Sequence, residues 1–175
     1  MGVILSCRQA LKMKELTLRK YPDPILNTVC TPVEEVNEKV SNQVHSMLDL
    51  MYDSGGVGLA ANQAGKTNRI IVMDCSEDQD EPVCLINPVI KSSRGEVFLE
   101  EGCLSFPGVV VSVQRFEKIK VEFTNLGGDI QTKTFEGLHS ICVQHEIDHL
   151  DGKTFLDKIN RKSRRSIMRK VRKTK

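Results

Sequence analysis

The sequence predicts an α+β fold, with mostly antiparallel sheets around a central helix that carries a His-Glu-x-x-His motif, plus an N-terminal and a C-terminal helix. Three observations support this prediction. Helical periodicity appears between residues 37 and 54 and again between 138 and 150, strand-like segments lie between them, and the connections are short. Because the strands follow one another directly, antiparallel pairing is favoured over alternating βαβ units.

The first helix is predicted from its two ends and from an apolar face. Asn37 suits the N-cap, and the glycines after Ser54 should end the helix. The apolar face recurs at helical spacing in five positions: Val40, Val44, Met47, Leu48 and Met51. We therefore expect one side of this helix to pack on the core.

Strand-like segments fill the middle of the chain and are separated by Gly, Pro or Asn turns. Their predicted ranges are 69–74, 83–88, 96–100, 109–113, 118–124 and 129–135. A second helix follows and ends near Gly152, with apolar positions at Leu138, Ile141, Cys142, Ile147 and Leu150. The stretch after Asn160 is expected to form a third helix or a tail.

Length and composition set the broad class. A chain of 175 residues indicates one domain with a hydrophobic core, and no apolar run approaches the length of a transmembrane helix. The six cysteines lack short spacings and no signal peptide is recognisable, which favours a reducing cytosol over disulfides. We expect a disordered extension over residues 1–13, a folded domain over 14–160 and a basic tail or helix over 161–175.

Charge is distributed unevenly along the chain. Residues 161–175 contain nine Lys or Arg and no acidic residue, which leaves 16 basic against 23 acidic residues elsewhere. The body is therefore acidic and the tail strongly basic. Such a tail is either a nucleic-acid contact or a solvated terminal helix.

The first motif that indicates a catalytic site is QHEIDHL, residues 144–150. On a helix, His145 and His149 share a face because they lie four residues apart, so both imidazoles can reach one metal ion. Glu146 can approach the open position of that ion and take a proton from water. This is the arrangement of metal-dependent hydrolases.

Two histidines leave the site incomplete, because a catalytic ion usually takes three protein ligands. Cys103, in the segment EEGCLSFPG (residues 100–108), offers a thiolate on a tight turn among strands. A site with two imidazoles and one thiolate suits zinc or ferrous iron. The alternative is that Cys103 is a small buried apolar residue.

The segment AANQAGKT, residues 60–67, ends like a phosphate-binding loop. Such a loop joins a strand to a following helix, and its first position is glycine. Here the predicted helix comes before and a strand comes after, and Ala60 replaces the glycine. We therefore predict a turn with a solvated Lys66, and no nucleotide cofactor.

With these segments in place, the chain resembles the peptide deformylases, which remove the N-formyl group from the initiator methionine of new proteins. The resemblance is carried by GVGLAANQ (56–63), EGCLS (101–105) and QHEIDHL (144–150), and it extends from about Leu16 to Asn160. It implies a catalytic domain over 14–160 and a metal-dependent amidohydrolase that releases formate.

The resemblance also implies roles for individual residues. Cys103, His145 and His149 would hold the metal, and Glu146 would be general base and then general acid. The carboxamide of Gln63 and the backbone N–H of Leu104 would donate to the oxyanion. The residues expected to bind substrate are Gly56, Val57, Gly58, Glu101, Gly102, Leu138, Ile141 and Cys142. Glu101 is also expected to support the cysteine loop, with Arg115 as its partner.

Cofactor and partners follow from the same resemblance. We expect one divalent ion per chain, with Fe²⁺ as the native metal and Zn²⁺, Ni²⁺ or Co²⁺ as alternatives. The expected partners are N-formyl-methionine nascent peptides and, through the basic tail, the ribosome, with no membrane association. The expected location is the cytoplasm.

Two hypotheses from other classes remain open at this point. A metalloprotease also uses His-Glu-x-x-His, but it would not need Cys103 as third ligand together with Gln63. A non-catalytic RNA-binding or structural-zinc module would explain the tail and the Cys and His content. No paired Cys-x-x-Cys motif and no RNA-binding signature supports that second hypothesis.

Overall fold

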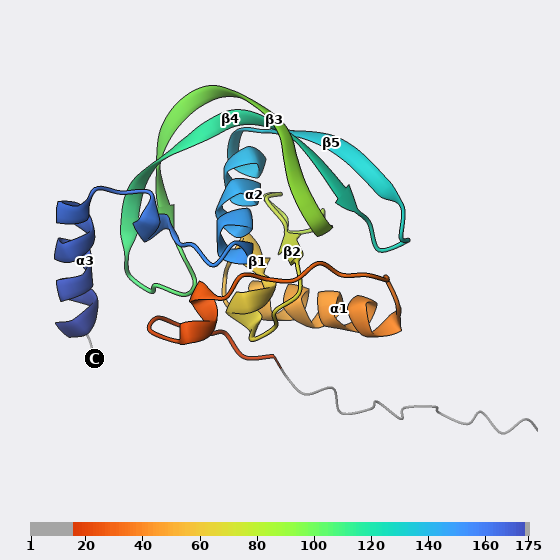
Figure 1. Ribbon diagram of the computed structural model, residues 1–175, viewed down its shortest axis with the longest axis horizontal. Coiled ribbons are helices and arrows are strands. Elements are labelled where there is room, and N and C mark those ends of the chain that lie inside the picture. Colours follow the sequence, from red (N-terminus) through yellow and green to blue (C-terminus); the bar gives the residue numbers. More distant parts are fainter. Residues whose placement is uncertain (1–15, 174–175) are drawn as a thin grey trace, which may run out of the picture.

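The computed structural model describes residues 16–173, and the extension expected over residues 1–13 lies outside them. The helices of this part of the chain are α1 (Glu38–Asp53), α2 (Gly137–Leu150) and α3 (Arg161–Lys173), with short 3₁₀ turns η1 (Pro24–Asn27), η2 (Ala61–Ala64) and η3 (Phe155–Asp157). The strands are β1 (Gly58–Ala60), β2 (Ile70–Met73), β3 (Val83–Gly102), β4 (Val110–Thr124) and β5 (Ile130–Glu136). Figure 1 shows their arrangement.

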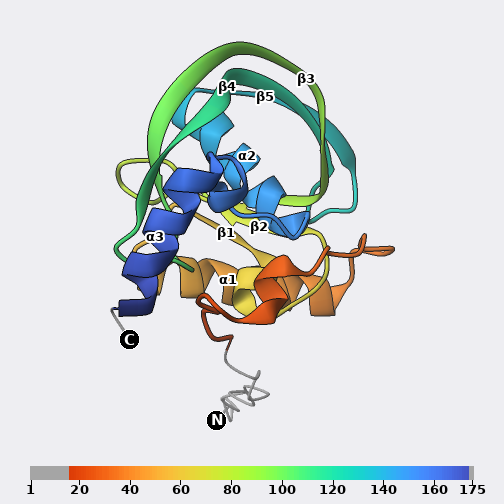
Figure 2. The same ribbon diagram turned by 60° about the vertical axis from the view of Figure 1, so that its left-hand side comes forward.

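The strands form one antiparallel sheet in the order β1-β2-β3-β4-β5, so every strand pairs with its neighbours in sequence. The long strands β3 and β4 curve over α2, which lies inside the bend (Figures 1 and 2). The predicted α+β class with antiparallel pairing around a central helix is confirmed. Because β1 pairs only with β2 in this sheet, its other side is an edge beside the site described below.

The first helix begins and ends as predicted. The Asn37 side chain accepts hydrogen bonds from the backbone N–H groups of Lys39 and Val40, at 3.1 and 3.2 Å. These bonds satisfy two of the donors that a helix start leaves unpaired. At the other end Gly55 takes a positive φ of 68°, which lets the chain leave the helix at once.

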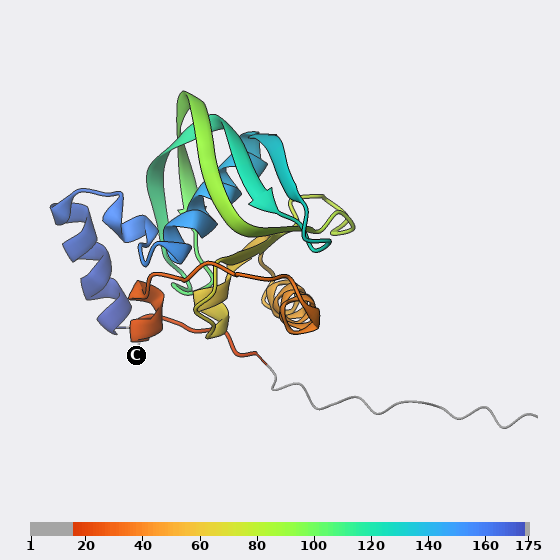
Figure 3. The same ribbon diagram turned by 45° about the vertical axis from the view of Figure 1, so that its right-hand side comes forward.

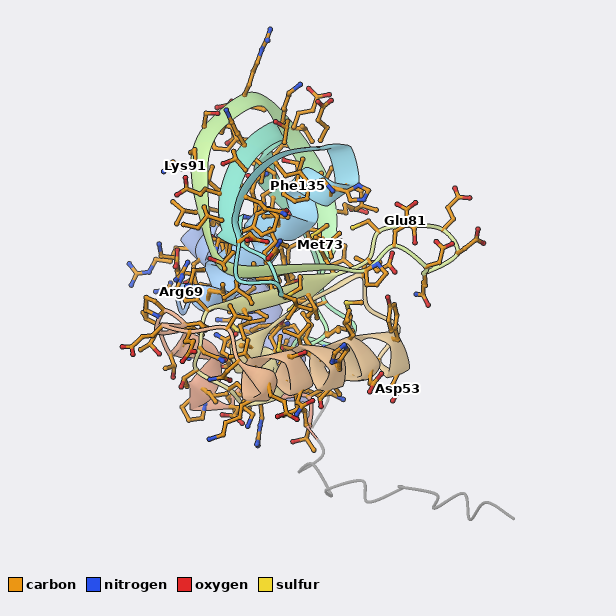
Figure 4. All side chains as sticks on the ribbon, turned by 90° about the vertical axis from the view of Figure 1, so that its right-hand side faces the viewer. Asp53, Arg69, Met73, Glu81, Lys91 and Phe135 are labelled. Atoms are coloured by element: carbon orange, nitrogen blue, oxygen red, sulfur yellow. The ribbon has the colours of Figure 1, made fainter. Side chains whose placement is uncertain are left out.

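Strand β2 is apolar at every position because both of its faces are covered. Ile71 and Met73 pack with α2 and the long strands, whereas Ile70 and Val72 pack against α1. This short strand therefore separates two apolar clusters and places α1 and α2 on opposite sides of the sheet. Figure 4 shows Met73 and Phe135 inside the molecule, while Glu81 lies on the loop that projects after β2.

The structure corrects the predicted strand breaks. Segments 83–88 and 96–100 are parts of one strand, β3, and segments 109–113 and 118–124 are parts of β4. Gly95, with a φ of 70°, bends β3 without ending it, and the pairing continues on both sides of it. This part of the hairpin faces solvent, so its residues do not alternate between buried and exposed positions. Their polar sequence therefore resembles that of a loop. The short strand β1 was not predicted.

The predicted C-terminal helix is present as α3, at one edge of the molecule (Figures 2 and 3). Ile167 and Met168 of this helix pack against an apolar cluster that contains Phe106 and Phe155. The basic side chains of its first turns are exposed. One apolar stripe therefore attaches α3 to the domain and leaves a basic face in solvent.

Between residues 16 and 173, none of the helices is long and apolar enough to cross a membrane. The five cysteines in this part of the chain are all free thiols.

Candidate active site

The motif helix α2 is almost completely enclosed, although it carries several ionisable side chains. His149 is fully buried, and His145 and Glu146 are 8% and 4% exposed. Buried polar groups of this kind require partners, because each would otherwise lose the solvation it had in water. Their partners come from the Cys103 turn, from β3 and β4, and from the segment before β2.

Cys103 lies on the turn between β3 and β4, which brings its thiol to the histidines of α2. Its Sγ is 3.2 Å from Nε2 of His149. The ligand atoms of Cys103, His145 and His149 all lie within 4.8 Å of one another. One thiolate and two imidazoles converging on a point form a donor set suited to a transition-metal ion, so the residues present fit the expected cofactor.

The electrostatics around this cluster favour a cation. Burial and the neighbouring His145 hold the pKa of His149 well below its usual range, so its imidazole is neutral and able to act as a ligand. Burial also opposes charge on His145, but contacts with Cys103 and Glu101 raise the pKa of that ring well above its ordinary value. The anionic groups that attract a proton to His145 would equally attract a metal ion.

Glu101 orients His145 from the side away from the ligand cluster. One carboxylate oxygen lies 2.8 Å from Nδ1 of His145, and the carboxylate accepts two hydrogen bonds from Arg115, at 2.7 and 3.0 Å. Burial opposes its charge, yet these partners hold the pKa of Glu101 down to about 2. The predicted pairing of Glu101 with Arg115 is therefore present. Arg115 also binds Asp148 of the motif helix.

Replacing Arg115 by alanine is expected to loosen this arrangement. The change leaves Glu101 and Asp148 buried without their shared cation, a loss that typically costs about 3–5 kcal/mol of stability. Metal affinity should fall by about 10–100-fold, because His145 is no longer held in place. Thermal unfolding and metal retention against a chelator measure both effects. Arg69→Ala is the matched control, since Arg69 pairs with the half-exposed Asp151. Unchanged metal affinity and activity in Arg115→Ala would contradict the supporting role.

Gln63 lies on η2 with its side chain directed at the Cys103 turn. Its carbonyl oxygen accepts a hydrogen bond from the backbone N–H of Ala60, at 2.8 Å, which fixes the orientation of the amide. Its NH₂ group then faces Ser105 Oγ at 3.3 Å and Cys103 Sγ at 3.6 Å. The donor of this side chain therefore points toward the three clustered ligand atoms.

Glu146 borders the cleft beside the edge strand β1. Burial raises the pKa of Glu146 to about 7, and its Oε2 atom has no hydrogen-bond partner among the residues that the structure describes. A Cβ atom at Gly58 would lie 2.7 Å from Oε1 of Glu146 and 2.6 Å from Sγ of Cys142. Only glycine therefore leaves room at position 58 for the carboxylate and for anything that binds beside it.

These groups open into a cavity of about 700 Å³. Its wall contains all of the predicted site residues except His149, which is buried behind them: Gly56, Val57, Gly58, Gln63, Glu101, Gly102, Cys103, Leu104, Leu138, Ile141, Cys142, His145 and Glu146. Ile141 and Cys142 are buried in this wall, whereas Leu138 is 55% exposed at the rim. The cavity thus runs from an open apolar rim to a polar end at the ligand cluster.

The comparisons with known proteins agree with this geometry. The family model described as polypeptide deformylase matches residues 15–165. The chain belongs to the polypeptide deformylase family. A peptide deformylase of Neisseria gonorrhoeae is 45% identical over 161 residues, which cover 92% of this chain and 96% of the relative. One from Aquifex aeolicus is 43% identical over 156 residues, 87% of this chain and 92% of the relative.

Solved deformylase structures have the same fold. The enzyme of Legionella pneumophila has a TM-score of 0.86 at 41% identity, over 91% of this chain and 94% of that one. The enzyme of Synechococcus elongatus in complex with actinonin has a TM-score of 0.85 at 35% identity, over 91% of this chain and 89% of that one. The likeness thus covers the sheet, α2 and the turns that form the deformylase site.

The segment that resembles a phosphate-binding loop has a different geometry in this deformylase. Strand β1 ends at the first residue of this segment, and strand β2 follows it. The segment itself contains only the four-residue turn η2, and Gly65 caps the C-terminal end of that turn with a φ of 78°. The Gly-Lys-Thr therefore lies beyond the helical turn, and Lys66 is exposed. A phosphate would instead need the N-terminus of a helix.

Two residues inside the deformylase motifs were missed as site residues. Ser105 accepts a hydrogen bond from Gln63, and Asp148 binds both Arg115 and Lys158. Their membership of EGCLS and QHEIDHL was the available signal, but their partners lie in other segments. Leu99, which lines the cavity and is 41% exposed, was also missed, although the sequence placed it in a strand.

Proposed function

We propose that Cys103, His145 and His149 hold a divalent ion and that Glu146 transfers the proton during deformylation of a peptide. The observation that carries this proposal is the convergence of the three ligand atoms within 4.8 Å at the end of the cavity that Glu146 borders. We propose Fe²⁺ as the native ion, with Zn²⁺, Ni²⁺ and Co²⁺ as metals that the same donor set accepts. When bound, the ion supplies Lewis acidity that polarises the formyl carbonyl and activates water near neutral pH.

Glu146 is placed to move a proton from water to the leaving amine. As general base its carboxylate removes a proton from the attacking water, and as general acid it delivers that proton to the nitrogen that departs. Its buried position favours this exchange, because burial brings its pKa close to neutral and so makes both protonation states accessible. The products are formate and a free amino terminus.

Gln63 and the backbone N–H of Leu104 are proposed as donors to the oxyanion that forms on the formyl group. The support for Gln63 is its fixed amide, whose NH₂ group faces the ligand cluster. Leu104 directly follows the ligand Cys103, so its N–H lies on the same turn. Donors fixed before the reaction stabilise charge without reorganising as it develops.

Replacing Gln63 by alanine should lower kcat by about 10²–10³-fold, the usual effect of losing one oxyanion donor. The metal content should stay the same, because the three ligands are untouched. Steady-state kinetics with a formyl-methionyl peptide and metal analysis on one preparation test this. Gln43→Ala is the matched control, since Gln43 on α1 pairs with Asn68. A Gln63 variant with wild-type kcat would remove this residue from the mechanism.

The substrate is proposed to bind as an added strand along the edge of β1. Its backbone would pair beside Gly58, where the absence of a side chain allows close approach. The methionine side chain would enter the apolar wall that contains Ile141 and Cys142, with Leu138 and Val57 nearer to solvent. Glu101 and Gly102 would contribute backbone on the opposite side, because the Glu101 carboxylate is already held by Arg115.

A direct assay tests the proposed chemistry. The protein is purified without oxygen, its metal content is measured, and hydrolysis is followed with a formyl-methionyl peptide and with an unformylated peptide of the same sequence. Release of formate from the first peptide, with no internal cleavage of either, is expected. Cleavage within the chains would instead indicate a metalloprotease.

The basic face of α3 is proposed to dock on ribosomal RNA, where nascent chains are available in the cytoplasm. The exposed residues Arg161, Lys162, Arg165 and Arg169 give this face its charge, while Arg164 is engaged by Asp157. Because α3 is attached through Ile167 and Met168, its basic face points away from the domain. Phosphate contacts of this kind depend strongly on salt.

A chain ending at Asn160 should therefore lose ribosome binding and keep its activity on short peptides. Co-sedimentation with ribosomes at low salt measures the first effect, and peptide kinetics measure the second. A full-length variant with Arg161, Arg165 and Arg169 changed to Gln controls for lost packing of the helix. Equal co-sedimentation of the wild-type protein and both variants would show that α3 is a solvated helix only.

A further inference from the structure

Two cysteines to which the proposed chemistry gives no catalytic role lie close together, one of them in the wall of the methionine pocket. Cys142 is buried on α2 and forms part of the cavity wall. Cys75 follows the end of β2, packs against the same apolar cluster and is partly exposed. One thiol thus faces the substrate cavity, and the other can be reached from solvent.

A shared backbone carbonyl shows how closely the segments of these cysteines approach. The carbonyl of Val57 accepts a hydrogen bond from the N–H of Asp74 at 2.9 Å and one from Sγ of Cys142 at 3.6 Å. Asp74 is the residue before Cys75, and the thiols of Cys75 and Cys142 are close enough to shift each other's pKa. The end of β2, the start of β1 and the middle of α2 therefore converge at this pair.

The two thiols differ in accessibility and in the direction of their pKa shifts. The adjacent Cys142 thiol lowers the pKa of Cys75, although partial burial and the charges of Asp74 and Glu146 oppose this, whereas the adjacent Cys75 thiol and burial raise the pKa of Cys142. The accessible member is thus the one that ionises more readily, and thiolates are the reactive form. By contrast, burial raises the pKa of Cys30 to about 11 and that of Cys84 to about 12.

We propose that Cys75 and Cys142 are an oxidation site that takes hydrogen peroxide or an organic hydroperoxide and forms an intramolecular disulfide in the wall of the methionine pocket. The step needs no other reagent. The Cys75 thiolate attacks the peroxide, so that an S–O bond forms, the O–O bond breaks and hydroxide leaves as water after taking a proton. Cys142 then attacks the sulfenic sulfur, the S–S bond forms, and the S–O bond breaks to release a second water. Two thiols lose two electrons and two protons; hydrogen peroxide becomes two waters, and an organic hydroperoxide becomes one alcohol and one water.

The disulfide would change the substrate site through Val57. Sγ of Cys142 must turn from the Val57 carbonyl toward Cys75, and Val57 and Gly58 belong to the edge along which the peptide is proposed to bind. We expect kcat/KM for a formyl-methionyl peptide to fall by about 10–100-fold, since small misplacements of a bound substrate have effects of this size. This functional part rests on the proposed function, whereas formation of the disulfide does not.

The test uses the zinc-loaded enzyme, because zinc has no redox chemistry and keeps Cys103 bound as a thiolate. The protein is treated with hydrogen peroxide, digested without reduction and mapped by mass spectrometry, while zinc content and peptide kinetics are measured on the same sample. The expected result is a Cys75–Cys142 disulfide, a reversible fall in kcat/KM that dithiothreitol restores, and unchanged zinc.

Two variants complete the experiment. Cys75→Ser should deformylate like the wild type before treatment and resist inactivation, and Cys84→Ser should behave like the wild type in both respects. Equal inactivation of Cys75→Ser, or oxidation of Cys75 to a sulfinic acid without pairing to Cys142, would overturn the proposal. A mapped disulfide in a protein whose reduced form releases no formate would support the oxidation site and refute the proposed function.

Discussion

A Glu146→Gln enzyme should keep its metal and lose about 10⁴-fold in kcat, the upper end of what general acid–base catalysis contributes. Glutamine has the shape of the carboxyl group but cannot accept the proton from water. None of the three proposed ligand atoms belongs to residue 146, so the ion should remain. Stability should not fall, because burial already disfavours the charged form of this carboxylate and one of its oxygens has no partner in residues 16–173.

Metal analysis, thermal unfolding and steady-state kinetics on one preparation separate these effects. Glu122→Gln is the matched control, since Glu122 is an exposed residue of β4 that pairs with Lys91. Turnover retained in Glu146→Gln would move the proton transfer to another group. Loss of the metal instead would mean that Glu146 takes part in holding the ion, and the three-ligand arrangement would then be incomplete.

The features that could be predicted from the sequence are local ones. Helix α1 was predicted to within a residue at each end. Its apolar spacing lies inside the helix, and its cap Asn37 directly precedes it and bonds only to its first turn. The motif helix α2 was recognised because His145 and His149 share one face. In both cases the determining contacts join residues a few positions apart.

The long hairpin of β3 and β4 could not be predicted in the same way. Residues around Gly95 are polar on both faces, so they carry no alternating pattern, and their strand conformation depends on partners near Lys118. The site shows the same limit. The pairing of Arg115 with Glu101 was expected from the resemblance, whereas the link of Arg115 to Asp148 and the meeting of Cys75 with Cys142 follow only from the packing of α2 under the sheet.

The Cys103→Ala enzyme is expected to lose its metal and nearly all activity. Loss of a partner that merely orients a ligand costs about 10–100-fold in metal affinity, so loss of a ligand should exceed this. His145 and His149 alone would hold the ion weakly. The substitution removes the Sγ atom that lies 3.2 Å from Nε2 of His149. Equilibrium dialysis against a metal buffer measures the affinity, and Cys84→Ala, which removes a thiol from β3, should bind like the wild type.

A second substitution separates a ligand from a packing residue at position 103. Cys103→Asp restores the third donor as an anionic carboxylate, so it should bind metal more tightly than Cys103→Ala, while the harder oxygen ligand weakens the preference for iron and zinc. If Cys103 were only a small buried apolar residue, alanine would be the better replacement and aspartate the worse one, because it would add an unpaired charge to the interior. The order of metal affinities, aspartate above alanine or below it, therefore decides between the two roles.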